Sequence, residues 1–110
     1  IRVNPTAVRV PVFYGHSEAV NVETREKISA ADVRKLLETA PGVEVVDDAA
    51  PGGYPTPVTH ASGTDPVYVG RIREDESHPR AFNLWIVSDN IRKGAALNAV
   101  QIAELVAAER

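Results

Sequence analysis

The order of strand-like and helical stretches constrains the fold of this chain more than any other feature. Short runs typical of strands lie at residues 8–13, 18–24, 43–46, 67–73 and 81–87. Helical patterns follow only the second and the last of them. Since strands and helices do not alternate strictly, the pattern predicts an α+β domain, with a mixed or antiparallel sheet and helices packed on one face. A chain of 110 residues is long enough for one such domain.

The stretch that starts at Ser29 carries the clearest helix signals. Ser29 is a favoured N-cap residue, and Asp32 stands three positions later, as in a capping box. Ile28 and Val33 are placed for a hydrophobic staple, and the Pro-Gly pair at 41–42 ends the pattern. A second helix is predicted in the C-terminal segment KGAALNAVQIAELVAAE, whose small residues permit close packing.

Arg9 and His16 are the two residues that the pattern itself singles out for function. Arg9 lies inside the apolar run Val8–Phe13, which reads as a buried strand, and a buried guanidinium is costly unless it meets an anion. His16 follows at the Gly15 turn that ends this run, where a titrating imidazole can reach the same ligand. The pair predicts a clamp for a carboxylate or phosphate with an acid/base group beside it. The alternatives are a structural ion pair for Arg9 and a turn histidine bonded to a backbone carbonyl for His16.

Composition narrows the class of function. The net charge is −3 and no basic stripe gathers along the chain, which argues against a nucleic-acid partner. No signal peptide is visible and no apolar stretch has transmembrane length, so a cytoplasmic protein with no membrane partner is predicted. The absence of cysteine excludes disulfides, thiolate metal sites and a cysteine nucleophile within this chain, and no metal site is predicted. Because Ile1 replaces the usual methionine, we expect an excised domain or a processed chain.

Three further features lie in predicted loops. The Pro/Gly-rich stretch at 49–66 is unusually long, which is typical of a binding or interface element, and we expect it to pack on a partner subunit; a mobile surface insertion is the alternative. His60 and His78 are expected to be exposed to solvent and to have no catalytic role. Asn90 precedes the last helix, where asparagine is a common N-cap and where an anion or an amide can be bound.

Three segments carry a resemblance to a known family: VRVPVFYGHSEAVNVET, PTPVTHASGTDPVYVGRIRED and SDNIRKGAALNAVQIAE. Together, and in this order, they closely resemble the C-terminal part of bacterial aspartate-β-semialdehyde dehydrogenase. The resemblance implies that residues 1–110 are part of a catalytic and dimerisation domain of the glyceraldehyde-3-phosphate-dehydrogenase-like type. The family's N-terminal Rossmann domain and its nucleophile segment are absent from this chain.

The resemblance implies an NADP-dependent oxidoreductase of amino-acid biosynthesis. Members of the family use NADPH to reduce L-aspartyl 4-phosphate to L-aspartate 4-semialdehyde, a step that feeds lysine, threonine, methionine and diaminopimelate synthesis. The implied partners are the small-molecule substrate and further copies of the chain in a homodimer or a higher homo-oligomer. The NADP would be bound mainly by the absent Rossmann domain.

Carried over residue by residue, the resemblance assigns three roles. His16 falls on the general acid/base, Arg9 on the arginine that binds the substrate carboxylate, and Asn90 on a position that contacts NADP. Because the nucleophile is missing, the 110-residue chain alone is predicted to be inactive. The alternatives are a non-catalytic paralogue or oligomerisation domain of the same fold, and a bare interaction domain that binds only protein. The presence of both Arg9 and His16 favours the enzyme.

Overall fold

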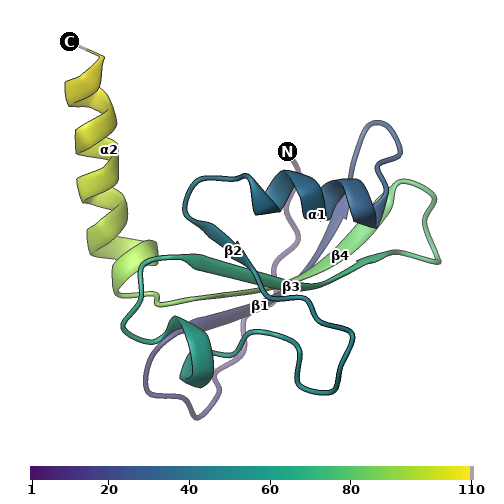
Figure 1. The fold of residues 1–110 in the computed structure, drawn as a ribbon, viewed down its shortest axis with the longest axis horizontal. Coiled ribbons are helices and arrows are strands. Elements are labelled where there is room, and N and C mark those ends of the chain that lie inside the picture. The colour runs from purple at the N-terminus through teal and green to yellow at the C-terminus, as the bar shows by residue number, and fades with distance from the viewer. Residues whose placement is uncertain (110) are drawn as a thin grey trace.

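A four-stranded mixed sheet forms the centre of the computed structural model, which describes residues 1–109 (Figure 1). The strands are β1 (His16–Glu23), β2 (Val43–Val45), β3 (Val67–Glu74) and β4 (Ala81–Ser88), in the spatial order β1-β4-β3-β2. Strand β4 pairs antiparallel with both β1 and β3, whereas β2 pairs parallel with β3. The predicted α+β class with a mixed sheet is confirmed.

Helix α1 (Ala30–Glu38) covers one face of this sheet. The Ser29 hydroxyl oxygen accepts the backbone N–H of Asp32 at 3.1 Å, so the predicted cap is confirmed. Val33 is buried against the apolar side chains of the sheet, and Ile28 packs on the same cluster, as a staple requires. Leu36, on the outer side of the helix, is 62% exposed.

The long loop at 49–66 folds back on the opposite face of the sheet. It contains a single helical turn, η1 (Pro57–Ala61), where the sequence predicted a loop. Ala61 is fully buried against Tyr68 and Val87, and the Trp85 indole N–H donates to the carbonyl oxygen of Pro55 at 2.9 Å. This loop covers part of its own sheet because its small and apolar residues shield side chains that would otherwise face water.

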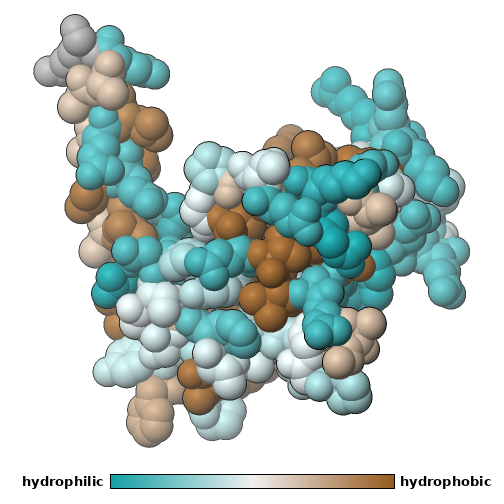
Figure 2. All heavy atoms as spheres, viewed as in Figure 1, coloured by the Kyte–Doolittle hydropathy of each residue, from teal (hydrophilic) through white to brown (hydrophobic). Residues whose placement is uncertain are grey.

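The C-terminal residues form a short helical turn, η2 (Arg92–Ala96), that continues into α2 (Leu97–Ala108), so the predicted second helix is confirmed. Figure 1 shows α2 standing away from the sheet, and none of its residues is buried within the described chain. Figure 2 shows apolar side chains exposed along it, and Leu105 is 68% exposed. Of these two α-helices, only α1 therefore packs on the sheet. No helix of residues 1–109 is long and apolar enough to cross a membrane.

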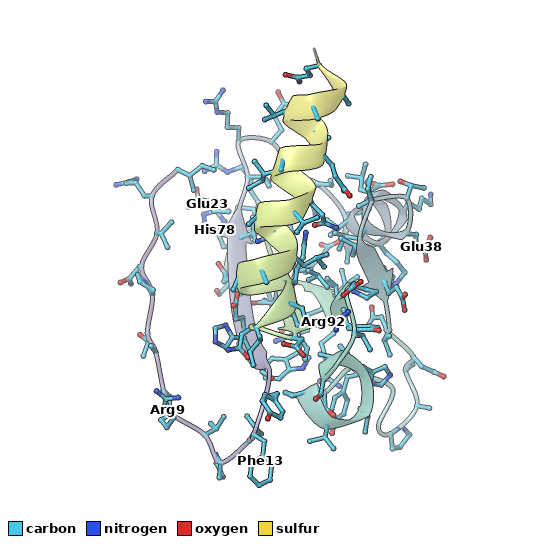
Figure 3. The ribbon with its side chains drawn as sticks, turned by 90° about the vertical axis from the view of Figure 1, so that its left-hand side faces the viewer. Arg9, Phe13, Glu23, Glu38, His78 and Arg92 are labelled. Carbon is cyan, nitrogen blue, oxygen red and sulfur yellow. The ribbon has the colours of Figure 1, made fainter. Side chains whose placement is uncertain are left out.

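The N-terminal segment, residues 1–13, differs most from the prediction. The run Val8–Phe13 was expected to be a buried strand, but it forms no strand, and Val8 and Phe13 are 78% and 100% exposed. In Figure 3 the segment loops away from the sheet. A strand needs a neighbour for its backbone groups, and within residues 1–109 no strand lies beside this segment. The prediction was wrong because apolar composition does not supply a pairing partner.

Candidate functional site

His16 is the first residue of β1, where it lies opposite Ser88 at the end of β4. The prediction placed it after a strand, but the Gly15 turn precedes the strand that contains it. Its side chain is exposed and makes no hydrogen bond or ion pair within the described residues. An imidazole in this position is open to a ligand, and the position of its backbone is set by the sheet.

The turn before His16 is bound to the end of β4 by Asn90. The backbone N–H of Gly15 donates to the Asn90 Oδ1 at 2.9 Å, across 75 positions of sequence. Gly15 has a φ of +103°, and a Cβ added there would lie 2.8 Å from the Pro57 Cβ. Only glycine suits this position, because a side chain would meet both backbone strain and a clash. The structure therefore brings two of the three predicted site residues, His16 and Asn90, to one junction.

Asp89 is a residue of this junction that the sequence analysis missed. It is 5% exposed, and its carboxylate accepts the backbone N–H groups of Gly63 at 2.8 Å, Ile91 at 2.9 Å and Arg92 at 3.3 Å. The Gly63 N–H is the main cause of a lowered Asp89 pKa; burial opposes it, and the other two N–H groups and the Arg92 charge add to it. Asp89, rather than Asn90, thus caps the start of the helical segment. A signal was present, since aspartate is as good an N-cap as asparagine.

Arg9 is not brought to this junction. It is exposed on the N-terminal segment, which stands away from the sheet in Figure 3, and it makes no ion pair within residues 1–109. The prediction that Arg9 lies in a buried strand is wrong, for the reason given above for its whole segment. Its role in binding a carboxylate stays a prediction.

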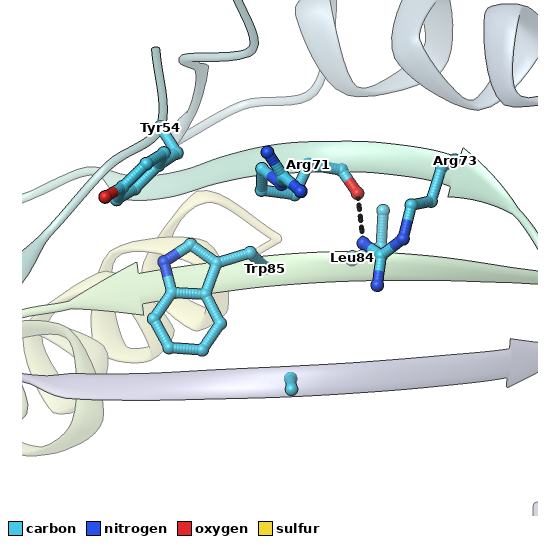
Figure 4. A pocket seen from close by; sticks show the side chains of 6 residues that line it. Tyr54, Arg71, Arg73, Leu84 and Trp85 are labelled. Atoms are coloured by element: carbon cyan, nitrogen blue, oxygen red, sulfur yellow. Dashed lines mark hydrogen bonds between the residues drawn. The ribbon is translucent and has the colours of Figure 1, made fainter. Parts of the chain in front are cut away.

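A second surface with functional side chains lies on the sheet face opposite α1 (Figure 4). A hollow of about 380 Å³ is lined by Ala19, Tyr54, Arg71, Arg73, Leu84 and Trp85. Arg71 has a positive φ of 53°, at an irregularity in the β3–β4 register, and its carbonyl accepts a guanidinium N–H of Arg73 at 2.9 Å. Neither arginine pairs with an acid among the described residues. Tryptophan, tyrosine and arginine are the side chains enriched in the centres of protein interfaces.

The other two histidines are half-buried, and not exposed as predicted. The His60 ring nitrogen Nδ1 lies 2.7 Å from the Thr59 hydroxyl, and the ring packs near Tyr68. The His78 Nε2 lies 3.7 Å from a carboxylate oxygen of Glu23 (Figure 3). Within residues 1–109, no group of three or more histidine, cysteine or acidic side chains is arranged to hold a metal ion.

The fold and the junction define the class of protein as an α+β domain that presents a histidine at the end of an exposed strand. A family model described as "Semialdehyde dehydrogenase, dimerisation domain" matches residues 2–93, and the chain belongs to this family. It is 62% identical over 109 residues to an aspartate-semialdehyde dehydrogenase of Legionella pneumophila, and the aligned residues make up 99% of this chain and 31% of the relative. It is 52% identical over 109 residues to that of Aquifex aeolicus, covering 99% of this chain and 32% of the relative.

Solved structures of the same family share the fold. The aspartate semialdehyde dehydrogenase II of Vibrio cholerae, complexed with ASA, is 56% identical and superimposes with a TM-score of 0.84 over 90% of this chain and 29% of its own. The enzyme from Francisella tularensis is 26% identical with a TM-score of 0.79, over 89% and 28% of the two chains. The chain thus spans less than a third of these structures.

Proposed function

We propose that this chain is the C-terminal part of an aspartate-semialdehyde dehydrogenase and that His16 is its general acid/base. The reaction is the NADPH-dependent reduction of L-aspartyl 4-phosphate to L-aspartate 4-semialdehyde with release of phosphate, in the synthesis of lysine, threonine, methionine and diaminopimelate. The observation that carries the proposal is an exposed imidazole at a rigid strand end, in a chain 62% identical to a dehydrogenase of that name. A cytoplasmic location belongs to the same proposal.

His16 would move a proton between the nucleophilic thiol, supplied by the rest of the enzyme, and the reacting oxygen of the substrate. An imidazole ring can both accept and return a proton, which a general acid/base must do. Its exposed side chain, without a partner in residues 1–109, leaves both ring nitrogens available for this transfer.

Arg9 would hold the substrate carboxylate. The planar guanidinium can bind both carboxylate oxygens at once and thereby orient the carbonyl that reacts. This role requires the N-terminal segment to lie against the junction in the complete protein, since Arg9 is exposed and unpaired in the described chain.

Asn90 would contribute to the binding of NADP. Its Oδ1 accepts the Gly15 N–H, while its amide nitrogen Nδ2 has no partner within residues 1–109. A half-buried amide N–H with no partner fits the carboxamide of a nicotinamide, which offers a carbonyl oxygen. NADPH, when bound, supplies the hydride, and the rest of the enzyme would provide most of its binding site.

Dimerisation is the second part of the proposal. The surface that suits a second copy is the hollowed sheet face with Tyr54, Arg71, Arg73 and Trp85, because these residue types dominate interface cores. The Arg73→Glu change would disrupt it, and we expect sedimentation of the complete enzyme to show a dissociated species. Wild-type assembly in that variant would move the interface elsewhere. A non-catalytic oligomerisation domain of the same fold is the second candidate function, and this surface supports it equally.

The two candidates differ in what His16 does. In the complete enzyme, His16→Ala should lower kcat by about 10²- to 10⁴-fold, the usual contribution of a general acid/base. The control is His78→Asn, which changes a half-buried histidine paired with Glu23 and should leave kcat within about twofold. Equal activity of the His16 variant and the wild type, both folded, would overturn the catalytic proposal and favour the scaffold.

A further inference from the structure

Three segments that are distant in sequence meet where β1 begins. The Gly15 turn comes from the N-terminal side, Asp89 and Asn90 follow β4, and Pro57 and Gly63 belong to the long loop. The β1–β4 ladder ends at the pair His16–Ser88, and just beyond it the Asn90 side-chain oxygen accepts the N–H of Gly15.

We propose that Asn90, held in place by Asp89, is a positioning residue for His16. The inference rests on the proposed function, in which His16 transfers the proton. Asn90 acts through the Tyr14–Gly15 peptide group, whose N–H it accepts one residue before His16, and not by contact with the imidazole.

His16 depends on its own backbone for the placement of its ring. Its side chain has no partner in the described chain, so its place is decided by the backbone from which it projects. That backbone is constrained on one side by the ladder to Ser88 and on the other by the Gly15–Asn90 hydrogen bond of 2.9 Å. Removing the second constraint frees the Tyr14–Gly15 peptide group and the Gly15 φ and ψ torsions, which set the path by which the chain enters His16.

The Gly15 turn has a defined direction. With φ at +103° and Pro57 at contact distance from any Cβ, the turn is packed on the long loop and follows a single path. Its N–H points at the Asn90 oxygen, and it would be unsatisfied in a half-buried place if that oxygen were removed.

Asp89 holds the backbone at Asn90 in place. The Asp89 side chain accepts the N–H of Ile91, so Asn90 lies inside a closed Asx turn. The same carboxylate accepts the Gly63 N–H at 2.8 Å, which ties this turn to the loop that supports Gly15. The ion pair between the Arg92 Nε and the Asp65 Oδ1, at 2.6 Å, also joins the long loop to the helical segment that follows β4. These contacts hold the backbone from which the Asn90 side chain projects.

The test compares two replacements of Asn90 in the complete enzyme. Asn90→Ala removes the oxygen that accepts the Gly15 N–H, and we expect kcat to fall about 10- to 100-fold, the usual consequence of misplacing a reacting group. The KM for the aspartyl substrate should change less than about threefold, and the limb of the pH–rate profile that belongs to His16 should shift. Asn90→Asp keeps an acceptor oxygen but lacks the amide N–H. It should recover most of kcat and raise the KM for NADPH. It should also move the limb of the pH–rate profile that belongs to His16 to higher pH, because a nearby negative charge favours the imidazolium.

The matched control is Ser29→Ala, which removes the N-cap of α1 and changes nothing at the junction. It should lower the unfolding temperature and leave kcat and the pH profile unchanged. If Asn90→Ala fails to fold, Asp89→Ser replaces it: serine still caps the helix but is too short to reach Gly63, and the same shift of the His16 limb is expected.

Two results would overturn the inference. One is that both Asn90 variants keep kcat and raise only the KM for NADPH, which would make Asn90 a cofactor contact alone. The other is that alanine and aspartate lower kcat equally, since the acceptor oxygen would then be irrelevant. A fully active His16→Ala variant would instead contradict the proposed function. In that case crystal structures still decide the positioning: the His16 ring should be displaced in Asn90→Ala and not in Ser29→Ala.

Discussion

Arg9 and His16 lie seven residues apart in the sequence, yet they belong to regions that are held in opposite ways. His16 begins a strand that pairs along its whole length with β4, and the turn before it is bonded to Asn90 and packed on Pro57. Arg9 lies in an exposed segment in which the Val12 N–H donates to the Val10 carbonyl oxygen, and which pairs with no strand within residues 1–109. Residues of this chain therefore hold the backbone of His16 in place, whereas they do not hold that of Arg9.

The comparison teaches where each half of the proposed site is made. Covering apolar side chains such as Val8 and Phe13 lowers the free energy by roughly 25 cal/mol per Å² of apolar surface buried. Within the described chain no surface covers them. We therefore expect the acid/base group to be preorganised by this domain and the carboxylate clamp to be completed by the rest of the enzyme.

The largest expected effect is the loss of activity when Arg9 is replaced. Arg9→Leu should lower kcat/KM of the complete enzyme by about 10²- to 10³-fold, because two charge-assisted hydrogen bonds to a carboxylate are lost. A loss expressed chiefly as a raised KM would mark a ground-state binding role. Thermal unfolding of the 110-residue chain should be unchanged, since Arg9 makes no ion pair in residues 1–109. The control is Arg2→Leu in the same segment; if it lowers kcat/KM as much, Arg9 has no particular role.

The next prediction concerns a substitution that introduces strain into the turn before His16. Gly15→Ala forces a side chain into a left-handed φ and against Pro57, and should destabilise the protein by about 2–3 kcal/mol. Gly42→Ala is the control, because Gly42 also has a positive φ, of +73°, but no neighbouring atom lies within 4 Å of an added Cβ. Its cost should be about 1 kcal/mol, from the backbone alone. Equal unfolding temperatures for the two variants would show that the contact with Pro57 is unimportant.

A third prediction concerns the exposed N-terminal segment, residues 1–13. Phe13→Ala should have no effect on the thermal unfolding of the 110-residue chain, in which this ring is fully exposed. In the complete enzyme it should cost about 2 kcal/mol, because the ring would there be covered. The same small change in both proteins would mean that the segment stays exposed and that Arg9 is not brought to the junction.

The smallest expected effect is a pH dependence. The Asp89 pKa is lowered in the folded state, chiefly by the Gly63 N–H, so the folded protein releases this proton more readily than the unfolded chain. The resulting stability is fully present above the unfolded pKa, about 3.9, and is lost as the pH falls through the lower folded value. Urea unfolding of Asp89→Asn should therefore depend less on pH in this range than that of the wild type.

The control for Asp89 is a second aspartate with the same direction of shift. Hydrogen bonds from Ser77 lower the pKa of Asp75, at the far end of the sheet. Asp75→Asn should likewise flatten the acid limb of the stability profile, and it should leave kcat unchanged. If Asp89→Asn also leaves kcat unchanged, the junction contributes to stability and not to the placement of His16.

Local signals predicted the elements that depend on neighbouring residues. The cap at Ser29, the staple between Ile28 and Val33, and the alternation in β1 all act within a few positions, and each was confirmed. The residues quoted for the family resemblance likewise lie in order along the chain, and the family match over residues 2–93 agrees with them.

Long-range contacts decided the rest. Whether the apolar run around Val10 becomes a strand depends on a neighbouring strand, and the run itself carries no information about one. The bond between Gly15 and Asn90 spans 75 positions, and the burial of Asp89 under Gly63 depends on how the long loop folds back on the sheet. Propensity and capping act between neighbours along the chain, whereas hydrogen-bond satisfaction and burial are properties of the whole fold. The sequence alone could therefore name His16, but only the tertiary structure shows what holds it.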